Sequence, residues 1–149
     1  MTHMNFKLLE GRNILVTGAD GFIGSHLAER LAEEGATVRA MVCYNSFGST
    51  GWLNPSRSPR IYENISVVSG DIRDPFFVSQ ISQDIEFIFH LAALIAIPFS
   101  YVAPQSYVET NITGTVNVLE ACRRHNVKRM IHTSTSEVYG TALFTPINE

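Results

Sequence analysis

The sequence predicts an α/β fold in which helices cover both faces of a parallel sheet. Short apolar runs rich in β-branched residues alternate with amphipathic helical segments along the chain, and a glycine-rich turn follows the first run directly. Such alternation is typical of parallel sheets wound by right-handed crossovers. We therefore expect a doubly wound sheet of about five strands in the order 3-2-1-4-5, with the sequence stopping before any later strands of such a fold.

The individual elements are read from two periodicities, two residues for strands and 3.6 residues for helices. The expected strands lie at 13–17, 36–42, 65–69, 85–91 and 128–133. The expected helices lie at 22–34, 75–82 and 105–125.

In the first half of the chain, the run NILVT at 13–17 is apolar on both faces, as a central parallel strand requires. Apolar residues recur at three- and four-residue spacing through 22–34, which predicts a helix, and Gly35 suits its C-terminal end. The second strand, 36–42, is followed by the segment 43–60, which is rich in Ser, Asn, Gly and Pro. We expect a long loop there, and loops of that length are often functional.

In the second half, Asp74 followed by Pro75 predicts the start of a short helix, because Asp is a good N-cap and Pro suits the first helical position. Pro98 and Pro104 separate the fourth strand from a long amphipathic helix. The last strand follows that helix, and no element is expected after Tyr139.

Composition excludes several classes of partner. The 149 residues carry a formal net charge of −3, and no basic run is longer than Arg123-Arg124, so we expect neither nucleic acid nor an anionic membrane as a partner. Cys43 and Cys122 lie far apart, which predicts no metal site and is typical of reduced thiols in a cytoplasmic protein. No apolar run reaches the ~18 residues of a membrane span.

The most informative motif is the turn after the first strand, where Gly18, Gly21 and Gly24 repeat at a spacing of three. In a strand–turn–helix unit, the first glycine permits a tight turn, the second lets a pyrophosphate approach the backbone, and the third lets the helix pack on the strand. The N–H groups at the start of the helix then face the phosphates. This motif predicts a Rossmann-like, dinucleotide-binding domain.

Further motifs extend this prediction along the chain. TGADGFIGSHL (17–27), GDIRD (70–74), HLAA (90–93), NITGTVNVLEA (111–121) and HTSTSEVYG (132–140) occur in an order and spacing that resemble the extended short-chain dehydrogenases/reductases, the NAD-dependent epimerase/dehydratase family. The resemblance implies that residues 1–149 form an NAD(P)-binding domain that is incomplete. It also implies a substrate domain further along a longer chain.

By this resemblance the cofactor is held by the glycine turn and by residues that follow the later strands. The expected cofactor residues are Gly18, Asp20, Gly21, Phe22, Ile23, Gly24, Asn45, Asp71, Ile72, Leu91, Ala92, Ala93 and Thr133. His90 is expected to be a packed histidine rather than a catalytic one.

The choice between NAD and NADP depends on the end of the second strand. A carboxylate there would bind a ribose 2′-hydroxyl, and arginines would bind a 2′-phosphate. The segment 41–45, MVCYN, contains neither, and Arg39 lies inside the strand. We expect NAD because no basic clamp is present, and NADP stays open.

The resemblance places catalysis at Thr135, Ser136 and Glu137. In the family, the position of Thr135 hydrogen-bonds the sugar hydroxyl that is oxidised, and Glu137 matches a glutamate of the 4,6-dehydratases. Within the family, YNSFGSTGWL (44–53), ALIAIPFSY (93–101) and TSTSEVYGTA (133–142) resemble the nucleotide-sugar 4,6-dehydratases of legionaminic acid biosynthesis. The implied substrate is a nucleotide-linked N-acetylglucosamine, which becomes a 4-keto-6-deoxy sugar.

The family's catalytic base is a tyrosine with a lysine four residues later, and none of the five tyrosines here has that lysine. We therefore expect no turnover from these residues alone, and self-association, normally as a homodimer, through the long helix. Two alternatives stay open: part of a nucleotide-sugar 4-epimerase, or a dinucleotide-binding module without catalysis.

Overall fold

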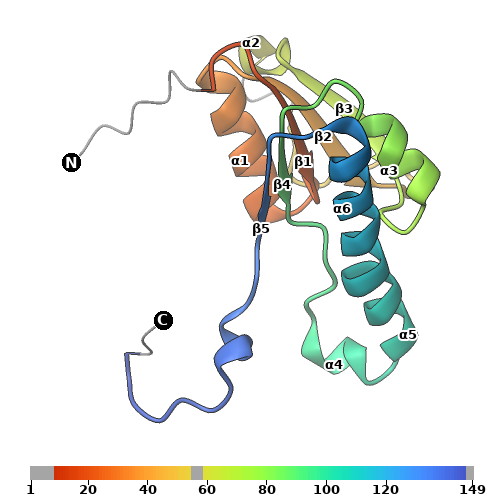
Figure 1. Cartoon of the computed structure of the whole chain (residues 1–149), viewed down its shortest axis with the longest axis vertical. Helices are drawn as coiled ribbons and strands as arrows, with labels where there is room; N and C mark the ends of the chain where they lie inside the picture. The colour runs from red at the N-terminus through yellow and green to blue at the C-terminus, as the bar shows by residue number, and fades with distance from the viewer. Residues whose placement is uncertain (1–8, 55–58, 147–149) are drawn as a thin grey trace.

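The computed structural model describes residues 9–54 and 59–146, and their core is a five-stranded parallel sheet in the order β3-β2-β1-β4-β5 (Figure 1). The strands are β1 (Asn13–Thr17), β2 (Thr37–Cys43), β3 (Ile65–Gly70), β4 (Phe87–His90) and β5 (Arg129–His132). The predicted fold class and strand order are confirmed. The fourth strand is shorter than predicted, because only 87–90 stay in register with β1.

Helices cover both faces of the sheet. α1 (Phe22–Glu33) and the one-turn α2 (Pro59–Tyr62) contribute to the core on one face, and α3 (Pro75–Ile81) and α6 (Gly114–His125) to the core on the other (Figure 1). The remaining turns are α4 (Ile97–Ser100), α5 (Pro104–Tyr107), the π-helical η2 (Val108–Thr113) and the 3-10 helix η3 (Ser136–Tyr139).

The predicted long helix is three consecutive helical pieces, α5, η2 and α6, that together run from Pro104 to His125. The single-turn elements α2, α4 and η3 were not predicted, because four residues are too few to show a 3.6-residue repeat. The predicted loop at 43–60 is confirmed over 44–54, ends in α2 at 59–62, and at 55–58 lies outside the described residues.

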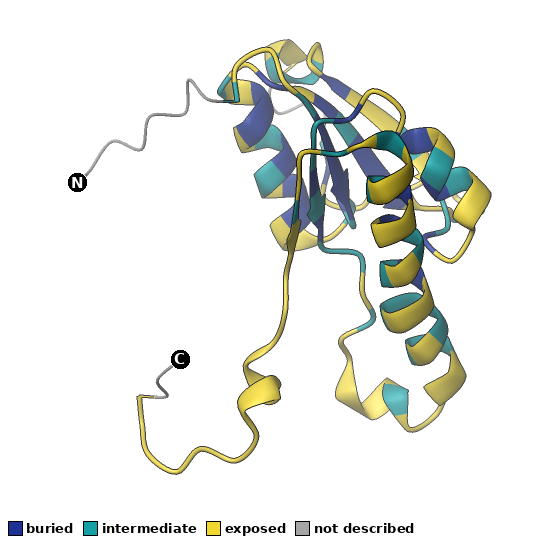
Figure 2. Ribbon diagram, in the orientation of Figure 1, coloured by how far each residue is buried: buried dark blue, intermediate teal, exposed yellow. Residues whose placement is uncertain are grey.

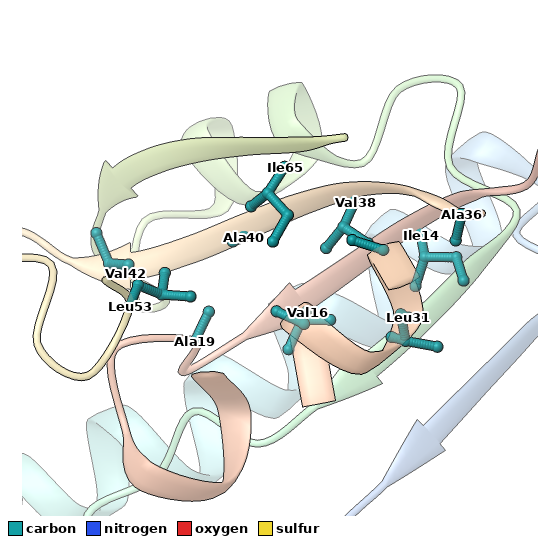
Figure 3. Packing of buried hydrophobic residues seen from close by; sticks show 12 residues of the cluster. Ile14, Val16, Ala19, Leu31, Ala36, Val38, Ala40, Val42, Leu53 and Ile65 are labelled. Carbon is teal, nitrogen blue, oxygen red and sulfur yellow. The ribbon is translucent and has the colours of Figure 1, made fainter. Parts of the chain in front are cut away.

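The core consists of two apolar clusters, one on each face of the sheet. Ile14 and Val16 of β1 point toward α1 (Figure 3), and Leu15 belongs to the cluster on the face of α3 and α6. All three side chains are fully buried. Burying an aliphatic side chain of this size stabilises a fold by about 1.5–3 kcal/mol, so β1 anchors both layers.

The side of the molecule beyond β5 is open. Within the described residues, β5 pairs with β4 alone, and its side chains are largely exposed (Figure 2). The long helix carries exposed apolar side chains at a spacing of three to four residues. These are Val108, Ile112, Val116 and Leu119, which are 46%, 60%, 51% and 52% exposed. We call these four residues the helix stripe.

No helix in the described part of the chain is long and apolar enough to cross a membrane. Over the same residues, no group of three or more His, Cys, Asp or Glu side chains is placed to hold a metal ion.

Candidate functional site

The expected cofactor residues lie at the C-terminal ends of the strands, which are all on the same side of the sheet because the strands are parallel. The N–H of Tyr44, just after β2, donates to the carbonyl of Gly70 at the end of β3 (3.0 Å). The N–H of Thr133, just after β5, donates to the carbonyl of His90 at the end of β4 (3.2 Å). These bonds join the ends of β2 and β3 and the ends of β4 and β5, and we call the C-terminal ends of the five strands the rim.

The glycine turn leaves no room for side chains at two positions. Gly18 has φ +68°, and a Cβ there would lie 2.8 Å from the backbone nitrogen of Ala92. A Cβ on Gly24 would lie 2.1 Å from the carbonyl oxygen of Gly18. The glycine spacing therefore reflects two close backbone approaches, between the turn and the end of β4 and between the turn and α1.

The start of α1 is suited to an anion. Its N-cap is Gly21, which offers no side-chain hydrogen bond to the first amides, and the first turn contains no acidic residue. The first N–H groups of a helix have no partner within the helix, and the helix dipole favours negative charge there. The residues at this position fit a diphosphate.

Thr17, the last residue of β1, links the turn to the end of β4. Its hydroxyl oxygen accepts hydrogen bonds from the N–H groups of Leu91 and Ala92, both at 3.1 Å, and lies 2.8 Å from Nδ1 of His90. A hydroxyl has two lone pairs and one hydrogen. Since the two amides use the lone pairs, the hydrogen goes to His90, and Nδ1 is the acceptor.

His90 is therefore the tautomer that carries its hydrogen on Nε2, which lies 3.1 Å from the hydroxyl of Thr115. Thr115 in turn donates to the carbonyl of Asn111 (2.7 Å). Burial, with a smaller contribution from the charge of His132, lowers the pKa of His90 from its ordinary 6.5 to about 4. His90 is only 2% exposed, so the expectation of a packed histidine is confirmed.

Asn111 fixes the far end of the segment that follows β4. Its Oδ1 accepts from the N–H of Leu94 (2.8 Å), and its Nδ2 donates to the carbonyl of the same residue (2.9 Å). Thr17 holds residues 91 and 92 from the other side. The backbone that we expect to line the cofactor is therefore held at both ends.

The side chains of Asn45 and Asp71, which were both expected to bind the cofactor, already have partners within the protein. Asn45 donates from Nδ2 to the carbonyls of Cys43 (3.2 Å) and Ser49 (2.8 Å), and its Oδ1 accepts from the N–H of Ser49. Asp71 pairs with Arg73 at 2.6 Å, and this hydrogen bond lowers the pKa of the Asp71 carboxyl. Asn45 therefore braces its own loop, and Asp71 carries a neutralising partner.

Ile72 is placed differently from Asp71. Its side chain is buried in the core on the α3 and α6 face, and a Cβ on Gly114 would come within 2.9 Å of it. The side chain therefore packs beneath the rim, so only the backbone of Ile72 is left to border a cofactor.

The loop after β2 folds back onto the glycine turn. Gly51 has φ +62°, a Cβ there would lie 2.2 Å from the carbonyl oxygen of Asp20, and the same oxygen accepts from the N–H of Trp52 (3.0 Å). The Trp52 ring meets Phe22 edge-on with ring centroids 5.3 Å apart. Phe22 and Ile23 are more than half exposed beside this contact.

A cavity of about 430 Å³ opens between the ends of β4 and β5 and the long helix. Leu91, Ala92, Ala93, Thr133, Thr135 and Glu137 line it, whereas Ser136 does not. Thr135 accepts the N–H of Glu137 at 3.3 Å and so fixes the start of η3. The structure thus brings Thr135 and Glu137 to the same cavity as the end of β4.

Sequence reasoning missed Thr17, Thr115 and Asn111 as parts of the site. Asn111 and Thr115 belong to the motif NITGTVNVLEA, from which no separate role was predicted for either residue. Their spacing of four residues, with polar side chains on the helix face toward the strand ends, was the available signal.

The sheet order and the glycine turn that leads into an uncapped helix define a Rossmann-like fold. A family model described as "GDP-mannose 4,6 dehydratase" matches residues 15–149, so the chain belongs to this family of nucleotide-sugar dehydratases and epimerases.

Known proteins similar to the chain include both 4-epimerases and 4,6-dehydratases. UDP-glucuronate 4-epimerase 1 of Arabidopsis thaliana is 34% identical over 142 residues, which cover 93% of this chain and 33% of that protein. The dTDP-glucose 4,6-dehydratase of Mycolicibacterium smegmatis is 36% identical over 130 residues, with 85% and 37% covered.

Among solved structures, the UDP-glucose 4-epimerase from Bifidobacterium longum in complex with NAD+ and UDP superimposes with a TM-score of 0.75 at 29% identity. The match covers 92% of this chain and 41% of that one. The chain therefore spans about a third of the length of these curated relatives and about two fifths of this solved structure.

Proposed function

We propose that the chain is the NAD-binding part of a nucleotide-sugar 4,6-dehydratase. The observation that carries this proposal is the position of Glu137, which lines the same cavity as Thr135 and as the end of β4. A carboxylate beside the expected nicotinamide position is what a dehydration needs in addition to oxidation. The name of the matching family model and the dehydratase among the relatives support it.

NAD would be held along the rim. The free amides at the start of α1 would bind its diphosphate, and the backbone after β4 would lie against the nicotinamide half. When bound, NAD supplies the hydride acceptor for C4 of the sugar and returns the hydride at C6.

The residues of the chain would divide the proton chemistry. The Thr135 hydroxyl would hydrogen-bond the C4 hydroxyl and orient it. Once C4 is a ketone, the adjacent C5 proton is acidic, and the Glu137 carboxylate removes it and assists departure of the C6 hydroxyl as water. Ser136 brings no second carboxyl group, so Glu137 serves both proton steps or a group outside these residues helps.

Oxidation at C4 also needs a base, which in the resembling family is the Tyr-Lys pair. No tyrosine of the chain has a lysine four residues later. We therefore expect no turnover from the 149 residues alone and place the base on the longer protein that the relatives predict.

A 4-epimerase is the second candidate, because several of the relatives carry that name. An epimerase returns the hydride to C4 and does not need a carboxylate at Glu137. The two candidates differ in product, since the dehydratase releases a 4-keto-6-deoxy sugar and the epimerase releases a sugar that keeps its C6 oxygen.

We propose a nucleotide-linked N-acetylglucosamine as the substrate, of the kind used in legionaminic acid biosynthesis. The support is the resemblance of the loop 44–53 and of the segments 93–101 and 133–142. We further propose that the protein is cytoplasmic and pairs with a second copy through the helix stripe, which is apolar and exposed.

Calorimetric titration of the chain with NAD tests the binding part of the proposal. We expect saturable one-to-one binding, with circular dichroism as the check that the chain is folded. A folded chain that shows no heat with NAD would contradict it.

The catalytic part is tested in a longer protein that contains the chain. There, Glu137→Gln should abolish the 4-keto-6-deoxy product, with Glu33→Gln, an exposed change on α1, as the matched control. An unchanged yield from Glu137→Gln would remove the dehydratase assignment.

A further inference from the structure

The carboxylate of Asp20 lies at the end of a strand to which it does not belong. Asp20 is in the glycine turn after β1, yet its Oδ2 accepts a hydrogen bond from the N–H of Cys43 at 3.3 Å. Cys43 is the last residue of β2. The turn therefore delivers a negative charge to the C-terminal end of the second strand.

That position decides which dinucleotide a Rossmann-like fold accepts. A carboxylate at the end of the second strand binds the ribose 2′-hydroxyl of NAD, whereas arginine accommodates the 2′-phosphate of NADP. The chain after β2 reads Tyr44-Asn45-Ser46 and supplies no carboxylate of its own. The amide group of Asn45 is occupied by its own loop.

We propose that Asp20 replaces the missing carboxylate of the second strand, so that it receives the adenosine ribose of NAD and rejects the 2′-phosphate of NADP. This inference rests on the proposed cofactor function and assigns its specificity to one side chain.

The charges around this point agree with rejection of a phosphate. Burial raises the pKa of the Cys43 thiol, and the negative charges of Asp20 and Asp71 raise it further. The two carboxylates thus act on the same place. Arg73 opposes them only in part, because its guanidinium is shared between Asp71 (2.6 Å) and Glu109 (3.2 Å).

The other nearby arginine of the described chain is turned elsewhere. Arg39, inside β2, donates from Nη1 to the carbonyls of Ile81 (2.7 Å), the last residue of α3, and of Gln83 (3.0 Å). A 2′-phosphate beside Cys43 would therefore face the carboxylate of Asp20, while Arg73 and Arg39 are both engaged by other groups.

The position of Asp20 is fixed by contacts of its backbone and of its side chain. Its carbonyl oxygen accepts the N–H of Trp52, and the contact with Gly51 presses the returning loop onto the same backbone. The backbone of Asp20 is therefore fixed, and turning its carboxylate away from a phosphate would break the hydrogen bond to the N–H of Cys43.

The test is the ratio of dissociation constants for NADP and NAD, measured calorimetrically on the chain at low ionic strength. We expect the native chain to prefer NAD by at least about tenfold, because a phosphate and a carboxylate in contact repel strongly at a protein surface. Asp20→Asn keeps the shape and an acceptor for the Cys43 N–H, and it should lower the ratio by about tenfold.

The matched control is Asp84→Asn. It makes the same chemical change in the exposed turn before β4, at the N-terminal end of the strands and so opposite the candidate site. Asp84 has φ +61°, a conformation that asparagine tolerates, so this variant should leave the ratio unchanged.

A second measurement needs no variant. Salt screens charge repulsion, so the preference of the native chain for NAD should shrink as ionic strength rises. An unaltered ratio in Asp20→Asn, or a preference that is insensitive to salt, would overturn the role of Asp20 while NAD binding itself persists. A folded chain that binds neither nucleotide would overturn the proposed cofactor function and this assignment with it.

Discussion

The buried histidine at the end of β4 should make the protein sensitive to mild acid. His90 is packed as the neutral tautomer between Thr17 and Thr115, and its pKa is lowered from 6.5 to about 4. Between those two pH values the unfolded chain binds a proton at His90 and the folded chain does not. Stability should therefore fall as the pH is lowered from 6.5 toward 4 and become independent of this group below that range.

The size of the effect follows from the shift. The difference between 6.5 and about 4 is about 2.5 pH units, and each unit corresponds to 1.36 kcal/mol, so the loss is about 3 kcal/mol. The geometry explains the cost. A proton on Nδ1 would face the Thr17 hydroxyl oxygen, whose lone pairs are already used by the N–H groups of Leu91 and Ala92.

Urea unfolding followed by circular dichroism at pH values from 7 to 4.5 measures this dependence. The comparison is His90→Asn, which keeps an acceptor near the position of Nδ1 but cannot titrate. This variant should be less stable at pH 7, because it loses the bond to Thr115, and its stability should vary less with pH. Parallel curves for the two proteins would refute the reasoning.

The Asp71 carboxylate, which is paired with Arg73, does not interfere with this measurement, because it acts at lower pH. The hydrogen bond from Arg73 lowers the pKa of Asp71, so its contribution to stability is present above the unfolded value of 3.8 and is lost as the pH falls below it.

Nitrogen NMR of the His90 ring provides an independent check, since the structure requires the hydrogen on Nε2 at neutral pH.

Three further changes test other parts of the structure. Gly24→Ala should weaken NAD binding at least about tenfold or prevent folding, because its Cβ would lie 2.1 Å from the Gly18 carbonyl oxygen, whereas Gly21→Ala, at 3.3 Å from the same oxygen, should lower the free energy of unfolding much less, as urea unfolding can show. Asp74→Ala removes the acceptor for two amides at the start of α3 and should lower the free energy of unfolding by about 1 kcal/mol without changing NAD binding, as urea unfolding and calorimetry can show. Ile112→Lys, in the middle of the helix stripe, should reduce self-association in sedimentation experiments and leave the circular dichroism spectrum unchanged, and a native chain that sediments as a monomer at high concentration would contradict the proposed pairing.

The sequence alone determined the local features of this protein. The glycine spacing at 18, 21 and 24 predicted the turn, Asp74 and Pro75 predicted the start of α3, and the alternation of strands and helices predicted the parallel sheet. Each of these depends on residues close together in the chain or on general rules for how strands connect. The one-turn helices at 59–62 and 97–100 escaped prediction because four residues are too few to show a 3.6-residue repeat.

Only the tertiary structure decided which side chains of the site meet. Asp20 reaches Cys43 across 23 positions, and Thr17 reaches His90 across 73. Periodicity tells which face of an element a residue occupies, but a contact between two elements also depends on strand register and on the path of the intervening loop. The missing carboxylate of the second strand therefore looked like an absence in the sequence, whereas in the folded chain a neighbouring turn supplies one.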